Sequence, residues 1–297
     1  MTIKKFYEIN NYRKRFLDER FFDSIDNKEK AYVLGLICSD GSIDNNGYAF
    51  SFISKDLDLI KLFKKTIKSD HKICKVESND KRTNKIYTRY TIHICSKYMV
   101  SSLKNIGVSN NKSFSCKMPK IPNHLFWHFL RGLFDGDGSI SKESASKEGR
   151  IRFKLIGSTS MIEDIKTILN KYRLSDTKIS RSKYFNEVGS ISSILYYSYD
   201  DLKLIFDKMY DDSDGLRLER KYNIFSTLKK YEIGKYDRMS KLKKVIQMDM
   251  NNRIIRIFNN KFEASKLLNI NPKLIQRVLN GGRASTHGYI FKYDEKI

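Results

Sequence analysis

A short pattern ending in an aspartate and a glycine occurs twice in this 297-residue chain. The first copy, residues 34–43, reads LGLICSDGSI, and the second, residues 131–140, reads RGLFDGDGSI. The acid that both copies share is Asp40 in the first and Asp137 in the second. A single Asp-Gly after an apolar helix is usually only a C-terminal turn. The repetition is therefore what indicates chemistry, with one half-domain for each copy.

The glycines of the pattern suggest how the two acids could meet. Gly35 and Gly132 remove side chains from the expected helices, so the two helices could pack backbone against backbone. Each helix would end at its aspartate, which would bring Asp40 and Asp137 together. Two carboxylates at one point repel each other unless a cation lies between them, and oxygen ligands suit Mg²⁺ or Mn²⁺. Because a divalent metal at a phosphate activates water and stabilises the leaving oxygen, the pattern predicts phosphodiester hydrolysis.

The residues around the first copy predict strands and helices in alternation. Asp26, three residues before Glu29, is typical of a capping box that opens the helix of the first motif. Residues 48–53 are apolar enough for a strand, and residues 57–67 have helical spacing. Residues 86–95 alternate between apolar and polar types, which predicts a strand with one polar face. That polar face consists of Tyr87, Arg89, Thr91 and His93.

The same order of elements follows the second copy. Residues 150–155 alternate between basic and apolar side chains and predict a strand, whereas residues 160–172 predict a helix. Residues 191–199 predict another strand and residues 201–210 another helix. The basic face of the first of these strands consists of Arg150, Arg152 and Lys154. The sequence therefore predicts an α+β fold in which two pseudo-symmetric repeats share an αββαββα plan.

A compact C-terminal unit follows a lysine-rich segment. Two strand-like pieces, residues 245–248 and 253–258, precede a short helix at residues 261–268. A second helix is expected to begin with Asn271 as N-cap and Pro272 at the first helical position. The turn between these helices has helix-turn-helix spacing. The expected domains are an N-terminal extension (1–24), repeat 1 (25–123), repeat 2 (124–230), a linker (231–244) and a helix-turn-helix-like DNA-binding module (245–297).

The net charge narrows the choice of partner. Lys and Arg number 57 against 34 Asp and Glu, a formal net charge of +23, and such an excess attracts a polyanion. No apolar run is long enough to span a bilayer, and residues 1–20 lack the hydrophobic region of a signal peptide. The four cysteines form no Cys-x-x-Cys pair. We therefore expect an intracellular protein, cytoplasmic or organellar, that has access to DNA, is not secreted and binds no membrane.

The paired motifs resemble those of the LAGLIDADG homing endonucleases in their single-chain, two-repeat form, over about residues 25–230. The second copy is a close match, whereas the first has Cys38 where an acid often stands. The resemblance implies a sequence-specific, Mg²⁺-dependent endonuclease that cuts both strands of a long double-stranded DNA target. It also implies an intron-encoded product of a mobile genetic element, acting as a monomer.

The resemblance further implies roles for individual residues. In this family the penultimate acid of the motif binds the metal, which transfers to Asp40 and Asp137, with Gly41 and Gly138 expected beside the metal. A basic residue stands near the metal-bound water. The stretches 111–113 (NKS) and 218–222 (LERKY), which resemble family landmarks, offer Lys112 and Lys221 for that catalytic role. The strands form a saddle over the DNA major groove. The expected DNA contacts of the saddle are Tyr87, Arg89, His93, Arg150, Arg152 and Lys154.

The C-terminal unit resembles the NUMOD-type helix-turn-helix modules that are appended to homing nucleases. The likeness lies in residues 262–268, 275–281 and 288–291. The side chains that a recognition helix would present to DNA are Lys273, Gln276, Arg277 and Asn280. A basic protein-interaction module is the other interpretation of this unit.

Two other functions stay open. The family includes proteins that bind intron RNA, so an RNA-splicing maturase is one alternative, and a DNA-binding regulator without catalysis is the other. Retention of both Asp40 and Asp137 favours cleavage over these alternatives. The chain begins with Met1 and ends in Glu295-Lys296-Ile297, without a terminal His-Asn, so we do not expect an intein.

Overall fold

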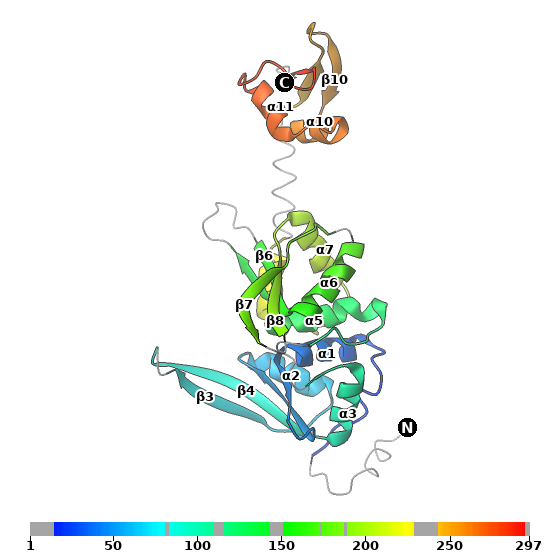
Figure 1. Cartoon of the computed structure of the whole chain (residues 1–297), viewed down its shortest axis with the longest axis vertical. Coiled ribbons are helices and arrows are strands. Elements are labelled where there is room, and N and C mark those ends of the chain that lie inside the picture. Colours follow the sequence, from blue (N-terminus) through cyan, green and yellow to red (C-terminus); the bar gives the residue numbers. More distant parts are fainter. Residues whose placement is uncertain are drawn as a thin grey trace. The chain divides into compact units, whose positions relative to one another are not determined.

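The computed structural model describes residues 15–80, 83–109, 116–142, 151–172, 174–186, 189–228 and 243–294. The chain divides into two compact units, Met1–Leu228 and Lys229–Ile297. The first unit holds both copies of the motif, and the second holds the C-terminal strands and helices (Figure 1). Most of the predicted linker, residues 231–242, lies outside the described residues, as do Lys112 and Arg150.

The first unit contains two repeats with the same order of elements. Repeat 1 consists of α1 (Lys28–Asp40), β1 (Gly41–Ile43), β2 (Ala49–Ser54), α2 (Leu57–Thr66), β3 (Ile73–Asp80), β4 (Lys85–Cys95) and α3 (Lys97–Ile106). Repeat 2 consists of η2 (Asn123–Leu125), α5 (Phe126–Asp137), β5 (Ser139–Lys142), β6 (Ile151–Ser158), α6 (Thr159–Lys171), β7 (Ser180–Asn186), β8 (Gly189–Tyr196), α7 (Tyr199–Tyr210) and α8 (Glu219–Ser226). The predicted α+β fold, with its αββαββα plan in both repeats, is confirmed.

Each repeat has a four-stranded antiparallel sheet, ordered β1-β2-β4-β3 in repeat 1 and β5-β6-β8-β7 in repeat 2. Alternation along the strands decides which face is buried. In repeat 1, Phe52 pairs with Ile92 and both are fully buried. The neighbouring pair, Ser51 and His93, lies on the opposite face, where the two side chains form a hydrogen bond of 2.9 Å. Each sheet therefore has one apolar face in the core and one polar face toward solvent.

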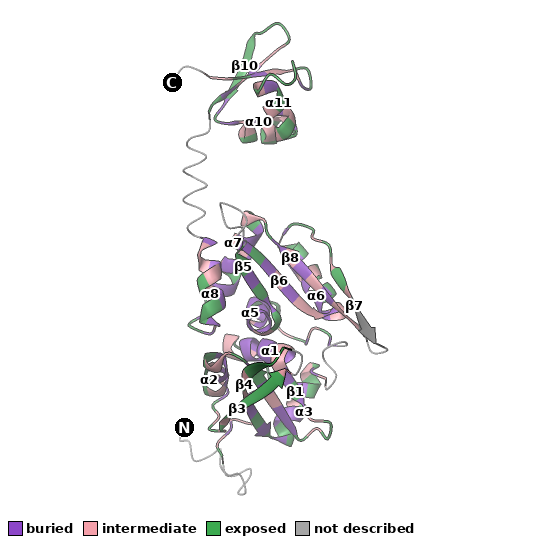
Figure 2. Ribbon diagram, turned by 90° about the vertical axis from the view of Figure 1, so that its left-hand side faces the viewer, coloured by how far each residue is buried: buried purple, intermediate pink, exposed green. Residues whose placement is uncertain are grey.

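The motif helices α1 and α5 pack side by side between the two sheets and are almost entirely buried (Figure 2). A Cβ atom on Gly35 would lie 2.2 Å from the carbonyl oxygen of Phe129, and one on Gly132 would lie 2.0 Å from that of Tyr32. Real Cβ atoms do not approach backbone so closely. The backbone-to-backbone packing expected from these two glycines is therefore present, and only glycine allows it.

The start of α1 differs from the prediction. Its N-cap is Asn27, not Asp26, because the Asn27 side chain accepts the backbone hydrogen bond from Lys30. Asp26 instead pairs with the Lys30 ammonium at 3.0 Å. A capping box needs its first acid three residues before the glutamate, and here the helix begins one residue later than that spacing implies.

The described part of the predicted N-terminal extension belongs to the core of the first unit. Leu17, Phe21 and Phe22 are buried, and the rings of Phe21 and Phe22 meet edge to face with centroids 4.9 Å apart. The backbone of Asp70 donates to Phe16 O, which ties this segment to the end of α2. Residues 16–22 thus pack into the first unit, and their apolar side chains were the signal that the boundary at residue 24 overlooked.

The second unit is a three-stranded sheet covered by two helices. Its elements are β9 (Val245–Met248), β10 (Ile254–Phe258), α10 (Lys261–Leu268), α11 (Pro272–Leu279) and β11 (Ile290–Tyr293), with strand order β10-β9-β11. Asn271 caps α11 by accepting from the Lys273 backbone, as predicted. The core consists of Val245, Phe258, Ala264, Ile270, Ile275, Val278 and Phe291. None of the helices in the described residues is long and apolar enough to cross a membrane.

Candidate functional site

The last turns of α1 and α5, which carry the two motif acids, pack against each other. α1 ends at Asp40 and α5 at Asp137, and the glycine after each has the same extended backbone, with φ/ψ of −80°/160° at Gly41 and −76°/160° at Gly138. A Cβ atom on Gly136 would lie 1.9 Å from Ser39 Oγ and 3.1 Å from Asp40 Oδ2. The end of one motif helix therefore lies directly against the end of the other.

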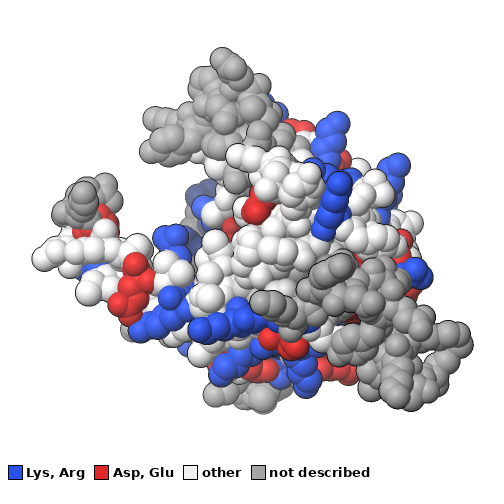
Figure 3. All heavy atoms as spheres, turned by 90° about the horizontal axis from the view of Figure 1, so that it is seen from below, with Lys and Arg blue, Asp and Glu red and all other residues white. Residues whose placement is uncertain are grey.

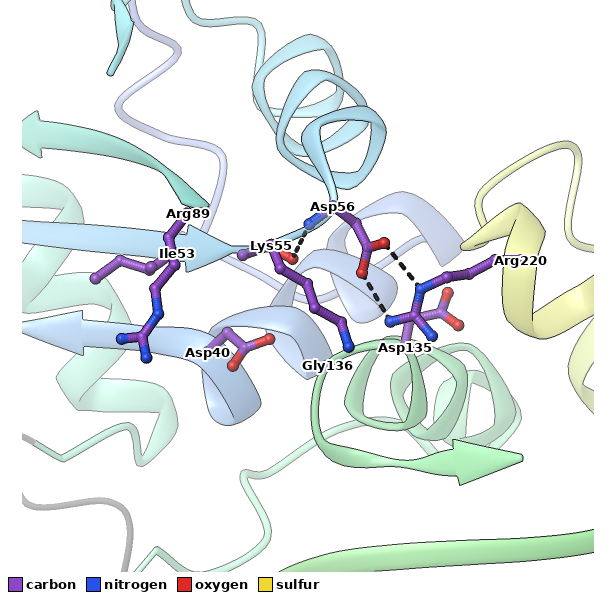
Figure 4. Close-up of a pocket in the computed structure, with 9 residues that line it drawn as sticks. Asp40, Ile53, Lys55, Asp56, Arg89, Asp135, Gly136 and Arg220 are labelled. Carbon is purple, nitrogen blue, oxygen red and sulfur yellow. Dashed lines mark hydrogen bonds and ion pairs between the residues drawn. The ribbon is translucent and has the colours of Figure 1, made fainter. Parts of the chain in front are cut away.

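Asp40 lines a cavity of about 420 Å³. The cavity is lined by Asp40, Ile53, Ser54, Lys55, Asp56, Arg89, Asp135, Gly136 and Arg220 (Figure 4). Lys55 follows β2, and its side chain extends toward Asp40 and Gly136 (Figure 4). Arg89 enters from β4, on the polar face that the alternation of that strand predicts. Asp40 thus shares one cavity with two exposed cations, Lys55 and Arg89.

Lys55 was not among the residues expected from the sequence. The expectation for a basic residue at the site rested on the stretches around Lys112 and Lys221, far from Lys55 in sequence. The available signal was its place between a strand and the N-cap of the next helix, Asp56, in the repeat whose motif ends at Asp40. A loop residue at a strand end is a common position for a functional side chain.

An ion pair across the cavity joins the two repeats. Arg220 on α8 donates from Nε to Asp56 Oδ1 at 2.8 Å and from its terminal nitrogen to Asp56 Oδ2 at 2.7 Å. These two parallel hydrogen bonds hold the pKa of the Asp56 carboxyl below its usual value. The charge of Arg220 is thereby committed to Asp56, which leaves Lys55 and Arg89 as the cations available beside Asp40.

The structure places Lys221 at the C-terminal end of α5, within electrostatic range of both Asp40 and Asp137. Its side chain is only 3% exposed, and its ammonium donates to the carbonyl oxygens of Phe134, Asp135, Gly136 and Gly138 at 2.5, 2.8, 3.3 and 2.6 Å. Burial lowers its pKa to about 8. Carbonyls at a helix C-terminus lack helical partners and attract cations. Lys221 therefore binds the end of α5, and its catalytic role stays a prediction.

Asp135 is a second buried charged group that the sequence did not single out. It is 1% exposed, and its Oδ2 accepts hydrogen bonds of 2.8 Å from the Tyr32 hydroxyl and from the Leu218 backbone. Burial raises its pKa to about 6. Asp135 stands where the first motif has Cys38, so the two motifs differ in a buried acid. This acid links α5 to α1 through Tyr32 and to the start of α8 through Leu218.

A smaller cavity of about 190 Å³ adjoins Asp137. It is lined by Cys38, Ser39, Cys116, Leu133, Asp137, Ile156, Gly157, Ser158, Met161 and Ile191. Apart from Asp137, the described lining residues carry no charge. The acids of the two motifs therefore open into cavities of different character.

The residues at the helix ends fit a divalent cation that is shared with a phosphate. No group of three or more His, Cys, Asp or Glu residues in the described part of the chain could hold a metal ion. Mg²⁺ commonly needs only one or two protein carboxylates, with water and substrate phosphates completing its shell. Asp40 and Asp137 supply that number. The Gly138 carbonyl, by contrast, already accepts from the Lys221 ammonium, and a second cation on that oxygen would be repelled.

The predicted sheet contacts lie on the polar faces of the two sheets. Tyr87, Arg89 and His93 are exposed on one face of β4, and Arg152 and Lys154 share the corresponding face of β6, opposite the buried Ile151, Phe153 and Leu155. On the face seen in Figure 3, Lys and Arg side chains gather in one group at the lower left, with carboxylates among them, and others stand apart. The described part of β6 thus has the basic face and the apolar face that its alternating sequence predicts.

In the second unit, α11 exposes Lys273, Arg277 and Asn280, whereas Gln276 is tied into the fold. The Gln276 amide donates to Asn280 Oδ1 at 2.7 Å and to the Tyr293 hydroxyl at 3.0 Å, and its oxygen accepts from the Lys261 ammonium. Gln276 therefore connects α11 with α10 and β11. Its expected contact with DNA stays a prediction.

Both repeats match models of LAGLIDADG-like domains. Residues 29–111 match the WhiA LAGLIDADG-like domain, and residues 128–208 match the LAGLIDADG-like domain. The chain therefore contains two LAGLIDADG-like domains, one in each repeat.

Individual relatives are distant. Over 215 residues the chain is 27% identical to the ATP-dependent DNA helicase Hel308 of Thermococcus kodakarensis. The aligned region covers 69% of this chain but only 18% of the helicase. Among solved structures, the homing endonuclease I-WcaI bound to its DNA recognition sequence has a TM-score of 0.46 at 14% identity, covering 75% of this chain and 97% of that one. The I-SmaMI LAGLIDADG homing endonuclease bound to cleaved DNA has a TM-score of 0.43 at 16% identity, covering 72% and 91%. Full-length WhiA from Thermotoga maritima has a TM-score of 0.42 at 14% identity, covering 75% of each chain.

Proposed function

We propose that this protein is a sequence-specific DNA endonuclease that cuts both strands of a double-stranded target with the help of a divalent cation such as Mg²⁺. The observation that supports the proposal is the close packing of the ends of α1 and α5, which carry Asp40 and Asp137, with Lys55 and Arg89 in the cavity beside Asp40. Two carboxylates and exposed cations at one point suit a polyanionic, metal-binding substrate.

The residues of the site have distinct tasks in such a reaction. Asp40 and Asp137 would hold a divalent cation, which would supply an activated water and stabilise the leaving oxygen. Lys55 and Arg89 attract the phosphate and stabilise the negative charge that develops on it, because both side chains reach the cavity of Asp40. Lys221 and Asp135 are positioning residues, since they hold the end of α5 and touch no reacting atom. Gly35 and Gly132 allow the close packing of the two helices whose ends carry these acids.

The polar faces of the two sheets would bind the DNA. Arg152 is suited to a bidentate contact with guanine in a major groove, and Lys154 to contacts with phosphates. In the second unit, Lys273 and Arg277 lie one helical turn apart on α11 and would add phosphate or base contacts. A long target, a monomeric enzyme and an origin in a mobile intron belong to the same proposal.

A direct test compares the intact protein with Asp137→Asn and Asp40→Asn on a randomised duplex library in Mg²⁺. The matched control is Asp211→Asn, an exposed acid at the end of α7. Double-strand cuts by the intact protein and the control, with at least about 10³-fold slower cutting by the two motif variants, would support the proposal. Binding of selected duplexes without cutting by any protein would refute it.

A DNA-binding protein without catalysis is the second candidate. It is favoured because, among the described residues, Asp137 is the one charged residue that lines its cavity. The same experiment separates the two candidates, because a regulator would enrich particular duplexes and cut none. A parallel binding measurement with structured RNA tests the maturase alternative.

A further inference from the structure

The two cavities at the motif acids occupy equivalent places in the repeats and differ residue by residue. The equivalence follows from strand register, since the motif serine of each repeat begins a row of paired residues. The row is Ser42–Ser51–His93 in repeat 1 and Ser139–Lys154–Leu195 in repeat 2. Four residues after Ser51 and Lys154 stand Lys55 and Ser158. Four residues before His93 and Leu195 stand Arg89 and Ile191.

All four of these residues line the cavity of their own repeat. In repeat 1 they are an exposed lysine and an exposed arginine, Lys55 and Arg89. In repeat 2 they are Ser158, which is 3% exposed and caps α6, and the partly buried Ile191. At matched positions, repeat 1 therefore has two cations where repeat 2 has a capping hydroxyl and the apolar side chain of an isoleucine.

Double-stranded DNA presents its two strands to a pseudo-twofold protein in the same way, because the antiparallel strands are themselves related by local twofold symmetry. Each strand's phosphate then meets the cavity of one repeat. A phosphate at the cavity of Asp40 would face two cations, whereas its equivalent at the cavity of Asp137 would face Ser158 and Ile191. Two cations of repeat 2, Lys154 and Arg181, line an adjoining cavity instead. Fixed charges aimed at a reacting phosphate stabilise its transition state, and the loss of one such group typically costs about 10²-fold in rate.

Building on the proposed nuclease function, we infer that the two strands are cut in a fixed order. The strand at the cavity of Asp40 is cut first, and a nicked duplex accumulates before the second cut. Lys55 and Arg89 set this order, since they act on one strand and not on the other.

The test uses a duplex recovered from the library, with a different dye on each strand, under single-turnover conditions in Mg²⁺. For the intact protein we expect one strand to be cut about 10²-fold faster than the other, with a nicked intermediate. Lys55→Met should slow that fast strand by about 10²-fold and change the slow strand less than about 3-fold. Ile191→Arg, which adds the missing cation at the matched position, should accelerate the slow strand only. Lys61→Met removes a charge from the exposed surface of α2 and serves as the matched control, with both strand rates expected to stay as in the intact protein.

Each outcome bears on a different claim. Equal rates for the two strands in the intact protein would overturn the fixed order while leaving the nuclease in place. Equal slowing of both strands by Lys55→Met would also overturn it, because Lys55 would then serve both phosphates or only binding. Absence of any cut by the intact protein would refute the nuclease and this inference together. Fluorescence of Trp127 in α5 shows whether each variant is folded.

Discussion

Replacement of Gly132 by alanine tests whether backbone contact between α1 and α5 holds the first unit together. Alanine is favoured over glycine within a helix by about 1 kcal/mol, so an unobstructed substitution would stabilise α5. Here the new Cβ would lie 2.0 Å from Tyr32 O and 3.0 Å from Leu36 N. Cβ atoms essentially never lie within 3.0 Å of another heavy atom that is not bonded to them, so the helices must separate by about 1 Å. No side-chain rotation can relieve a clash with backbone.

Overpacking of this kind costs about 1–3 kcal/mol where side chains can adjust. Because the obstacle is backbone, we expect the upper end, and the free energy of unfolding should fall by about 3 kcal/mol despite the gain in helix propensity. Urea unfolding followed by the fluorescence of Trp127 measures this change for the first unit. Trp127 is the single tryptophan of the chain and is 6% exposed in α5.

The matched control is Gly157→Ala, where the new Cβ would meet Ile162 Cδ1 at an ordinary 3.6 Å. Its unfolding free energy should stay within about 0.5 kcal/mol of the original. If Gly132→Ala were equally neutral, the close approach of the helices would not be a requirement of the fold. DNA cutting by Gly132→Ala should also fall by about 10²-fold, because a displacement of about 1 Å separates the two acids.

Three further perturbations address the charges around the site. Lys221→Met leaves the carbonyls at the end of α5 without their shared donor, so the free energy of unfolding should fall by about 2–3 kcal/mol in urea titrations, whereas a neutral effect would exclude the capping role. Burial raises the pKa of Asp135 from 3.8 to about 6, so the folded protein binds the carboxyl proton more tightly than the unfolded chain does. The contribution of this proton to the free energy of unfolding is complete below about pH 4 and is lost as the pH rises through 6. Between pH 4 and pH 7 the free energy of unfolding should therefore fall by about 3 kcal/mol in the original protein, and Asp135→Asn should abolish this fall. An unchanged pH dependence in Asp135→Asn would show that Asp135 is not the titrating group. A double-mutant cycle on Asp56→Ala and Arg220→Ala should give a coupling energy of about 1 kcal/mol, reduced by the partial exposure of both side chains, and zero coupling would show that the pair does not join the repeats.

Local sequence patterns predict the elements of this protein well, and the reason is periodicity. The alternation from Ile86 to Cys95 gives β4, because a half-buried antiparallel strand must alternate. Asn271 and Pro272 mark the start of α11, since both act on the first turn alone. The four-residue strand β11 (Ile290–Tyr293) was missed, because so short an apolar stretch has no period to detect.

The candidate site is predicted only where a motif carries it. Asp40 and Asp137 stand out by repetition, and the structure brings the ends of their helices together. Lys55 could not be chosen among many lysines, because its proximity to Asp40 depends on how β2 packs beside α1. The same holds for Gln276, whose partners Lys261 and Tyr293 are 15 and 17 residues away and become neighbours only after folding.

The buried ionisable groups around α5 are the strongest sign that this region serves more than stability. Arg131, Asp135 and Lys221 are 0%, 1% and 3% exposed within one layer of the fold. Apolar side chains of similar volume would usually give equal or greater stability than buried charges, since removal of each charge from water costs several kcal/mol. Arg131 ties α5 to Leu216 O and Met209 O, Asp135 ties it to α1, and Lys221 holds its last turn. All three constrain the helix that ends at Asp137, and under the proposed function they would serve the placement of that carboxylate.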